Sequence, residues 1–286
     1  MKKILSLIML TLVITGFSSC LKDDSIIGPD APGAIKNVVE FQNINYISSG
    51  TSSTYPLYVE SFNVAPTGSA TLRVNYAGVN AAPEDIAVKV VQDPSAIEKY
   101  NTENSTHYIA MPTSLYTLTT LDLVIPKGQR TAEITINVKP DQFDFALAYA
   151  LAFKIVSATN STISSNFGTV IISLGAKNAY DGIYQYTTSA NTSLQPNKNV
   201  EVELITQSST AVGLSPGLLA TYSNVVTYTV DPTTLAVTVT CPSLGVQTPQ
   251  DVRSKYDPTT KTFTVFWKQG NGNRTFEETL VYKRGR

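Results

Sequence analysis

Hydrophobic and polar residues alternate along much of the chain from residue 36 onward. Residues 131–138 and 149–155 follow the pattern strictly, with apolar side chains at every second position. Because successive side chains of a strand point to opposite faces, this period of two predicts half-buried β-strands. Shorter stretches at residues 69–76, 86–91 and 170–174 predict further strands. About seven strands in roughly 140 residues favour a β-sandwich of the immunoglobulin type.

The second half of the chain shows the same alternation between well-marked turns. Antiparallel strands are predicted at residues 200–206, 225–230, 235–240, 262–267 and 274–282. Their connections at Asp231–Thr234, Asp257–Thr260 and Gly270–Asn273 are rich in turn-forming residues. About eight strands without a long helix predict an antiparallel meander curled into a barrel or a sandwich.

One short helix and one boundary interrupt the strands. Pro94 favours the first turn of a helix, and Ile97 and Tyr100 follow at helical spacing. Asn178–Gly182 contains an Asp-Gly turn and marks the boundary between the two halves. We therefore predict an all-β protein with an immunoglobulin-like sandwich at residues 36–177 and an antiparallel barrel-like domain at residues 178–286.

The first 35 residues have a different character. Lys2 and Lys3 precede the apolar residues 4–17, which lead through two serines to Cys20. This order is typical of a secretory signal peptide, predicted at residues 1–19, and its apolar core of about 21 Å is too short to span a bilayer. The residues ending in Cys20 resemble a bacterial lipobox, which implies lipidation of Cys20. The alternative is an ordinary signal peptide that is cut nearby.

A tether is predicted at residues 20–35, where Gly and Pro favour a flexible spacer. Its start, Leu21-Lys22-Asp23-Asp24, resembles the surface-export signal of Bacteroidetes lipoproteins. That resemblance implies a lipid-anchored protein on the outer face of the outer membrane. A solvated acidic tether with no export role is the alternative interpretation.

An ordered set of motifs in the first half resembles a known family. The motifs are Tyr100–Tyr108, Met111-Pro112, Tyr116, Ile125–Gly128, Tyr149–Leu151 and Ser164–Gly168. Across residues 35–178 they are similar to a Bacteroidetes domain of unknown function, the immunoglobulin-like N-terminal half of surface lipoproteins from polysaccharide-utilisation loci. The second half faintly resembles the lipocalin-like domains of related lipoproteins. Some relatives carry a glycoside hydrolase or a carbohydrate-binding module instead.

Composition limits the chemistry. The 286 residues include 21 basic and 22 acidic side chains, which gives no footprint for nucleic acid. One His and two Cys exclude His- and Cys-rich zinc sites, so no metal and no cofactor are predicted. Glu277 and Glu278 are one of several carboxylate pairs, but adjacent residues of a strand point to opposite faces. A hydrolase is therefore the less favoured interpretation, and no catalytic residue is assigned.

Ligand binding rests on four residues of the second half. Trp267, the only tryptophan, belongs either to the core or to a platform on which a sugar ring stacks. Tyr256 beside a turn is the more exposed aromatic candidate, and Asn273 and Arg274 could supply hydrogen-bond donors. The favoured hypothesis is a non-enzymatic surface lipoprotein that binds glycan or assists its uptake. Its predicted partners are the outer membrane, a polysaccharide and glycan-uptake proteins of that membrane. The alternative is a structural or adhesion protein that binds other proteins.

Overall fold

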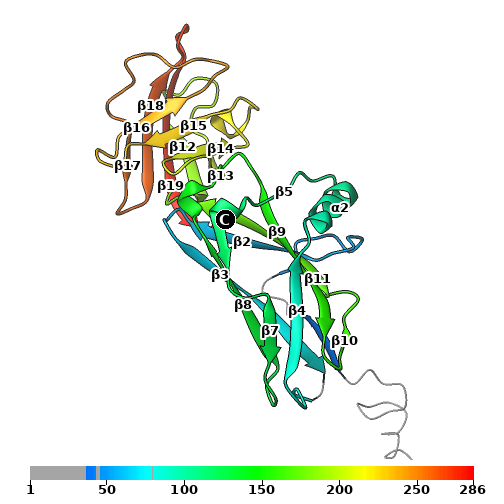
Figure 1. Cartoon of the computed structure of the whole chain (residues 1–286). Coiled ribbons are helices and arrows are strands. Elements are labelled where there is room, and N and C mark those ends of the chain that lie inside the picture. The colour runs from blue at the N-terminus through cyan, green and yellow to red at the C-terminus, as the bar shows by residue number, and fades with distance from the viewer. Residues whose placement is uncertain (1–36, 43–45, 79) are drawn as a thin grey trace, which may run out of the picture.

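The computed structural model describes residues 37–42, 46–78 and 80–286 (Figure 1). The predicted signal peptide, Cys20 and the tether at residues 20–35 lie outside these ranges. All the sheets belong to two lobes that follow each other along the chain, a β-sandwich and then an eight-stranded barrel. The predicted all-β fold class is thus confirmed. In the described part of the chain, no helix is long and apolar enough to cross a membrane.

Two sheets form the sandwich. The first contains β10 (Thr162–Ile163), β1 (Asn37–Phe41), β3 (Gly68–Gly78), β8 (Thr131–Val138) and β6 (Tyr116–Leu118), in this order. The second contains β2 (Leu57–Asn63), β11 (Thr169–Lys177), β9 (Tyr149–Ala158), β4 (Ile86–Gln92) and β7 (Asp122–Ile125), with β5 (Ile109–Ala110) beside β9. The strict alternation at residues 131–138 corresponds to β8, whose inward side chains meet those of β9 in one apolar core.

Helix α2 (Pro94–Asn104) covers the outer face of the second sheet. Pro94 occupies its first turn, as predicted, because a proline there loses no intrahelical hydrogen bond. Ile97 and Tyr100 are buried against β9 and β11. The other helical segments in the described ranges are the 3₁₀ turns η1 (Thr113–Leu115), η2 (Pro140–Gln142) and η3 (Leu218–Ala220).

The barrel is an up-and-down meander. Its strands are β12 (Gly182–Thr188), β13 (Asn199–Thr206), β14 (Ala211–Ser215), β15 (Thr227–Val230), β16 (Val237–Thr240), β17 (Lys255–Asp257), β18 (Thr262–Lys268) and β19 (Thr275–Arg284). Apart from β16 and β17, which end the sheet on either side, each strand pairs with the next one in the chain, and β19 returns to β12. Backbone hydrogen bonds from Val237 to Ser254 and from Tyr256 to Leu235, of 3.0 and 2.9 Å, join β16 to β17. The sheet is therefore nearly closed, and its two end strands meet at a single bridge between Ala236 and Lys255.

The two ends of the barrel differ. Tight turns occupy the end next to the sandwich, including the predicted Asp-Pro-Thr-Thr turns, in which Asp231 and Asp257 accept backbone N–H bonds. Longer loops occupy the other end: residues 189–198, 216–226, 241–254 and 269–274. Since long loops on a rigid scaffold are where binding sites concentrate, this loop end is where a site is expected.

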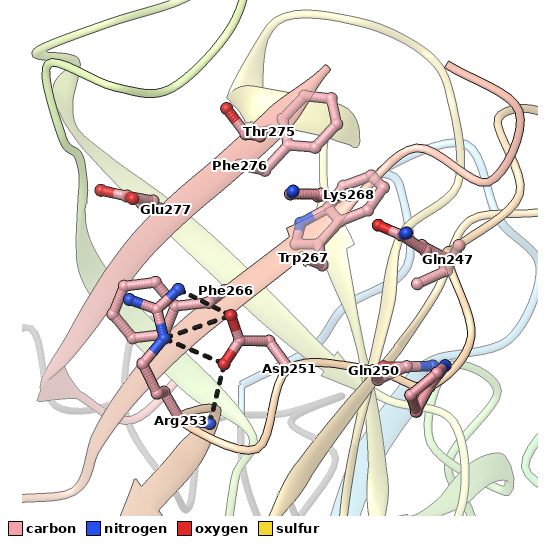
Figure 2. A pocket seen from close by; sticks show the side chains of 12 residues that line it. Gln247, Gln250, Asp251, Arg253, Phe266, Trp267, Lys268, Thr275, Phe276 and Glu277 are labelled. Carbon is pink, nitrogen blue, oxygen red and sulfur yellow. Dashed lines mark hydrogen bonds and ion pairs between the residues drawn. The ribbon is translucent and has the colours of Figure 1, made fainter. Parts of the chain in front are cut away.

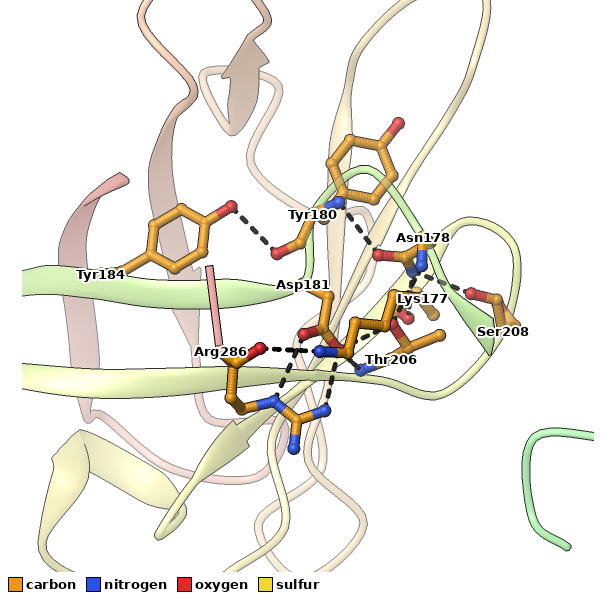
Figure 3. Close-up of polar contacts among 9 residues, drawn as sticks. Lys177, Asn178, Tyr180, Asp181, Tyr184, Thr206, Ser208 and Arg286 are labelled. Atoms are coloured by element: carbon orange, nitrogen blue, oxygen red, sulfur yellow. Dashed lines mark hydrogen bonds and ion pairs between the residues drawn. The ribbon is translucent and has the colours of Figure 1, made fainter. Parts of the chain in front are cut away.

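The junction between the lobes is held by polar contacts (Figure 3). Asp181, whose side chain is 1% exposed, accepts hydrogen bonds from the backbone and hydroxyl of Thr206, at 2.9 and 2.8 Å. It also forms an ion pair of 3.2 Å with Arg286. The side-chain amide of Asn178 donates to the carbonyls of Ser208 and Ala211, both at 2.8 Å. The segment predicted as the boundary is thus tied to the first turns of the barrel.

Candidate functional site

A pocket of about 360 Å³ lies at the loop end of the barrel (Figure 2). Strands β18 and β19 form one side of it, and the connection between β16 and β17 forms the other. Its lining comprises Val246, Gln247, Pro249, Gln250, Asp251, Arg253, Phe266, Trp267, Lys268, Thr275, Phe276 and Glu277. Its volume falls in the range of roughly 300–1,000 Å³ that is usual for small-ligand sites.

Strand alternation decides what β18 and β19 present to the pocket. Phe266 pairs with Glu277, and Lys268 pairs with Thr275, so all four side chains project from the outer face of the barrel. Trp267 and Phe276, which lie between them, point inward, and their rings stack at a centroid distance of 4.0 Å. The pocket therefore meets an outer surface with one aromatic, one cationic and one acidic side chain.

Side-chain hydrogen bonds fix the loop wall. The Gln250 amide accepts from the Val239 backbone N–H at 2.7 Å and donates to the Val239 carbonyl at 2.9 Å, as a neighbouring strand would. The Ser254 hydroxyl accepts from the Phe266 N–H and donates to the Phe266 carbonyl, both at 2.9 Å. These bonds occupy backbone groups of β16 and β18 at positions where β17 pairs with neither strand. The wall is thus held without a regular strand.

An ion pair forms one corner of the pocket. Arg253 donates to both oxygens of Asp251, with its shortest contact at 2.6 Å, and its guanidinium carbon lies 4.0 Å from the centre of the Phe266 ring. Figure 2 shows the guanidinium group beside both partners. The hydrogen bonds from Arg253 lower the pKa of Asp251 to about 2. Asp251 is therefore a carboxylate at neutral pH and no source of protons.

On the opposite side of the pocket, some polar groups have hydrogen-bond partners and others have none. Glu277 Oε2 accepts hydrogen bonds from Ser189 Oγ at 2.5 Å and from Asn191 Nδ2 at 3.4 Å. Within the described residues, the side-chain amide of Gln247 and the ammonium group of Lys268 have no hydrogen-bond partner. These two groups and Glu277 Oε1 are therefore available to a ligand.

A buried polar cluster lies behind the pocket, inside the barrel. Glu278 is 2% exposed and accepts hydrogen bonds from the Tyr228 hydroxyl at 2.5 Å and from Trp267 Nε1 at 3.3 Å. The buried Tyr186 hydroxyl adjoins the same carboxyl group. Loss of solvation raises the pKa of Glu278, because water cannot stabilise its charge. Glu277 and Glu278 thus project from opposite faces of β19, Glu277 outward and Glu278 into the barrel, as strand geometry requires.

The structure separates the four residues proposed from sequence. Trp267 adjoins the pocket but is 3% exposed, with its ring in the barrel core. Tyr256 was expected to be exposed, and that expectation is wrong: its ring packs edge-on against Tyr180 at a centroid distance of 4.8 Å inside the barrel. Its place next to a turn suggested exposure, but alternation along β17 turns it inward. Asn273 and Arg274 are exposed on the β18–β19 turn and do not line the pocket.

Sequence reasoning missed Phe266, Arg253 and Gln250. The outward position of Phe266 follows from the alternation of residues 262–267, which also placed Trp267 inward. Arg253 and Gln250 belong to a loop with no periodic pattern, so no local signal connects them to β18 or β16. Among the described residues, no group of three or more His, Cys, Asp or Glu side chains is arranged to hold a metal ion.

Together, the fold and this pocket define a two-part β-protein: a sandwich followed by a nearly closed barrel with a polar pocket at its loop end. A family model for a domain of unknown function, DUF7015, matches residues 182–284, which form the barrel. A second model, described as a "-like, N-terminal domain", matches residues 41–162. That match falls within the residues that carry the resemblance to Bacteroidetes N-terminal domains. A search of curated proteins found no match.

Solved structures share the whole arrangement. A protein of unknown function from Bacteroides ovatus, solved at 2.40 Å, matches with a TM-score of 0.56 and 13% identity, over 86% of this chain and 94% of its own. A second such protein, solved at 2.61 Å, matches with a TM-score of 0.55 and 13% identity, over 86% and 92%. A multidomain protein of that species that includes DUF1735 matches with a TM-score of 0.53 and 13% identity, over 85% and 92%. At this identity the likeness shows the fold alone.

Proposed function

We propose that this protein is a non-catalytic surface lipoprotein that binds a neutral glycan in the pocket at the loop end of its barrel. The observation that carries the proposal is the lining of that pocket. It presents two acids, Asp251 and Glu277, and two bases, Arg253 and Lys268, around the outward-facing ring of Phe266. Such a balanced lining suits a ligand without net charge that offers many hydroxyl groups.

Hydrogen-bonding capacity supports a sugar in particular. A sugar hydroxyl both donates and accepts, so it pairs well with a surface that contains open donors and acceptors. Gln247 offers both, Lys268 donates, and Glu277 Oε1 accepts. The polar groups that fix the wall, Gln250 and Ser254, already have partners, so the pocket is preformed.

The acid groups support binding without chemistry. A glycosidase needs a carboxyl group that is protonated at neutral pH and reaches the substrate. Asp251 has a lowered pKa, and Glu278, whose pKa is raised, is sealed inside the barrel. A lipid anchor at Cys20 and display in a polysaccharide-utilisation system belong to the same proposal, and they rest on the residues before and just after Cys20.

Affinity electrophoresis tests the binding. The chain without residues 1–20 is run in native gels cast with a β-glucan, a xylan, a mannan or an arabinogalactan, and in gels with an acidic polysaccharide. We expect retardation by at least one neutral polymer and a clear loss of it in Glu277→Gln. Glu203→Gln is the matched control, because Glu203 is exposed on β13 and does not line the pocket. Free migration in every gel would rule out the proposal.

A further inference from the structure

Phe266 differs from the other aromatic residues at the pocket. The rings of Trp267 and Phe276 are stacked on each other in the barrel interior, and these residues are 3% and 0% exposed. Phe266 is partly exposed and projects from the outer face of β18. Flat rings bind sugars through the apolar face of the pyranose, so an accessible ring face is required. Among the pocket-lining residues, Phe266 is the ring that can present one.

A side chain covers this ring in the free protein. The Arg253 guanidinium lies over Phe266 with its carbon 4.0 Å from the ring centre, the distance of a cation–π contact (Figure 2). We propose that Phe266 is the stacking platform for a sugar ring and that Arg253 is a displaceable cover over it. This inference rests on the proposed glycan binding, which it deepens by assigning the residue that holds the ring.

The cover is built to move without disturbing the barrel. The Arg253 side chain is 60% exposed, and the carboxylate that holds it belongs to Asp251, two residues away in the same loop. The Arg253 side chain makes none of the hydrogen bonds that fix the wall. Gln250 and Ser254 supply the bonds to β16 and β18, and Asp251 accepts one from the Arg253 backbone N–H at 3.0 Å. Arg253 can therefore swing away on its long stem while the backbone of the pocket stays in place.

The cover lowers affinity because its contacts must be broken before a sugar can stack. An exposed cation–π contact corresponds to a factor of about two to five in binding. Removal of the guanidinium group should therefore strengthen binding, whereas removal of the ring should weaken it. A direct hydrogen bond from Arg253 to the ligand would have the opposite effect on the first variant, so the two roles are distinguishable.

Four variants of the chain without residues 1–20 test the inference, with the polysaccharide that retards the wild type as the probe. By isothermal titration, Arg253→Ala should bind about two to five times more tightly, and Phe266→Leu about tenfold more weakly. The double variant should show no gain over Phe266→Leu, because there is no ring to uncover. Lys255→Ala removes a nearby exposed cation outside the pocket and should bind as the wild type does.

The outcomes separate this inference from the proposed function. If Glu277→Gln loses binding while Arg253→Ala binds no more tightly or Phe266→Leu is unaffected, the pocket binds glycan but the platform assignment is wrong. If the wild type binds no neutral polysaccharide in the panel but Arg253→Ala does, the cover is supported directly. If neither protein binds any of them, both proposals fail. Melting curves of each variant confirm that the barrel is folded.

Discussion

The sandwich and the barrel bury their interiors in different ways. The sandwich core joins two sheets through side chains such as Leu72, Ile134 and Phe153, and its main cluster is chiefly aliphatic and contains no carboxyl group. The barrel core is a set of rings in mutual contact, with Phe263 touching the rings of four tyrosines. It also holds the carboxyl group of Glu278, a residue that is 2% exposed.

This difference shows that the barrel, which carries the pocket, also contains a group that lowers its stability when unpaired. A buried carboxyl group lowers stability unless its partners are in place, whereas aliphatic packing depends on no such arrangement. The barrel therefore depends on hydrogen bonds to Tyr228 and Trp267, and the pocket lies directly outside the same strand pair. The sandwich offers rigid support, and the polar chemistry is concentrated in the barrel.

The largest expected effect separates the two cores. Phe263→Ala removes a ring that is 0% exposed and should destabilise the barrel by about 3–5 kcal/mol. Ile134→Ala removes a side chain of equal burial from the sandwich and should cost about 2–5 kcal/mol there. Urea unfolding followed by the fluorescence of Trp267, the only tryptophan, reports on the barrel, while circular dichroism reports on both lobes.

In this experiment the fluorescence midpoint should fall in Phe263→Ala and stay near the wild-type value in Ile134→Ala. Equal shifts in both variants would show that the two cores unfold as one unit. The separate hydrophobic clusters would then not correspond to separate unfolding units.

The buried carboxyl group gives the barrel its own pH dependence. Because the folded pKa of Glu278 is raised above its ordinary value of 4.5, the folded state binds more protons between the two pKa values. Its contribution to stability is complete below about pH 4.5 and is lost as the pH rises through the folded pKa. The glutamine of Glu278→Gln does not titrate, so the variant should not lose stability in this pH range as the wild type does. The difference in unfolding free energy between variant and wild type should therefore change with pH.

Glu203→Gln is the control for that comparison, since Glu203 is an exposed residue on β13 of the same barrel. Fluorescence-detected melts from pH 4 to pH 8 measure both variants. A difference between Glu278→Gln and wild type that stays constant over this range would contradict the raised pKa.

A smaller effect is expected at the junction of the lobes. Asp181→Asn keeps the shape of the side chain but removes the charge that binds Arg286 and Thr206. Since hydrogen bonds to a buried charged group contribute about 1.5–3 kcal/mol, the loss should lie in that range. Unfolding curves followed by fluorescence and by circular dichroism should separate further than in the wild type. An unchanged barrel midpoint would show that the junction adds nothing to barrel stability.

Sequence patterns predicted those parts of this molecule that depend on local periodicity. The alternation at residues 131–138 gave β8 with the correct bounds, and Pro94 gave the start of α2. The short strand β17 was not predicted, because Lys255–Asp257 contains a single inward residue, and so Tyr256 was wrongly expected at the surface. The pocket depends on contacts such as that of Gln250 with Val239, in which a loop side chain bonds to the backbone of a strand. No local pattern encodes such a contact.

The smallest effect concerns the tight turns at the sandwich end of the barrel. In the β17–β18 turn, Asp257 accepts hydrogen bonds from the Thr259 backbone and the Thr260 hydroxyl, at 2.9 and 2.8 Å, and these bonds lower its pKa. Asp257→Ala should destabilise the barrel slightly, and by less than Asp181→Asn does, because hydrogen bonds of an exposed turn contribute little. Asp257→Asn keeps an acceptor and should recover part of the loss, as measured by Trp267 fluorescence. Because this turn lies at the end opposite the pocket, glycan affinity should be the same in both variants. A change in affinity would mean that the two ends of the barrel are coupled and that the pocket is less preformed than its hydrogen bonds indicate.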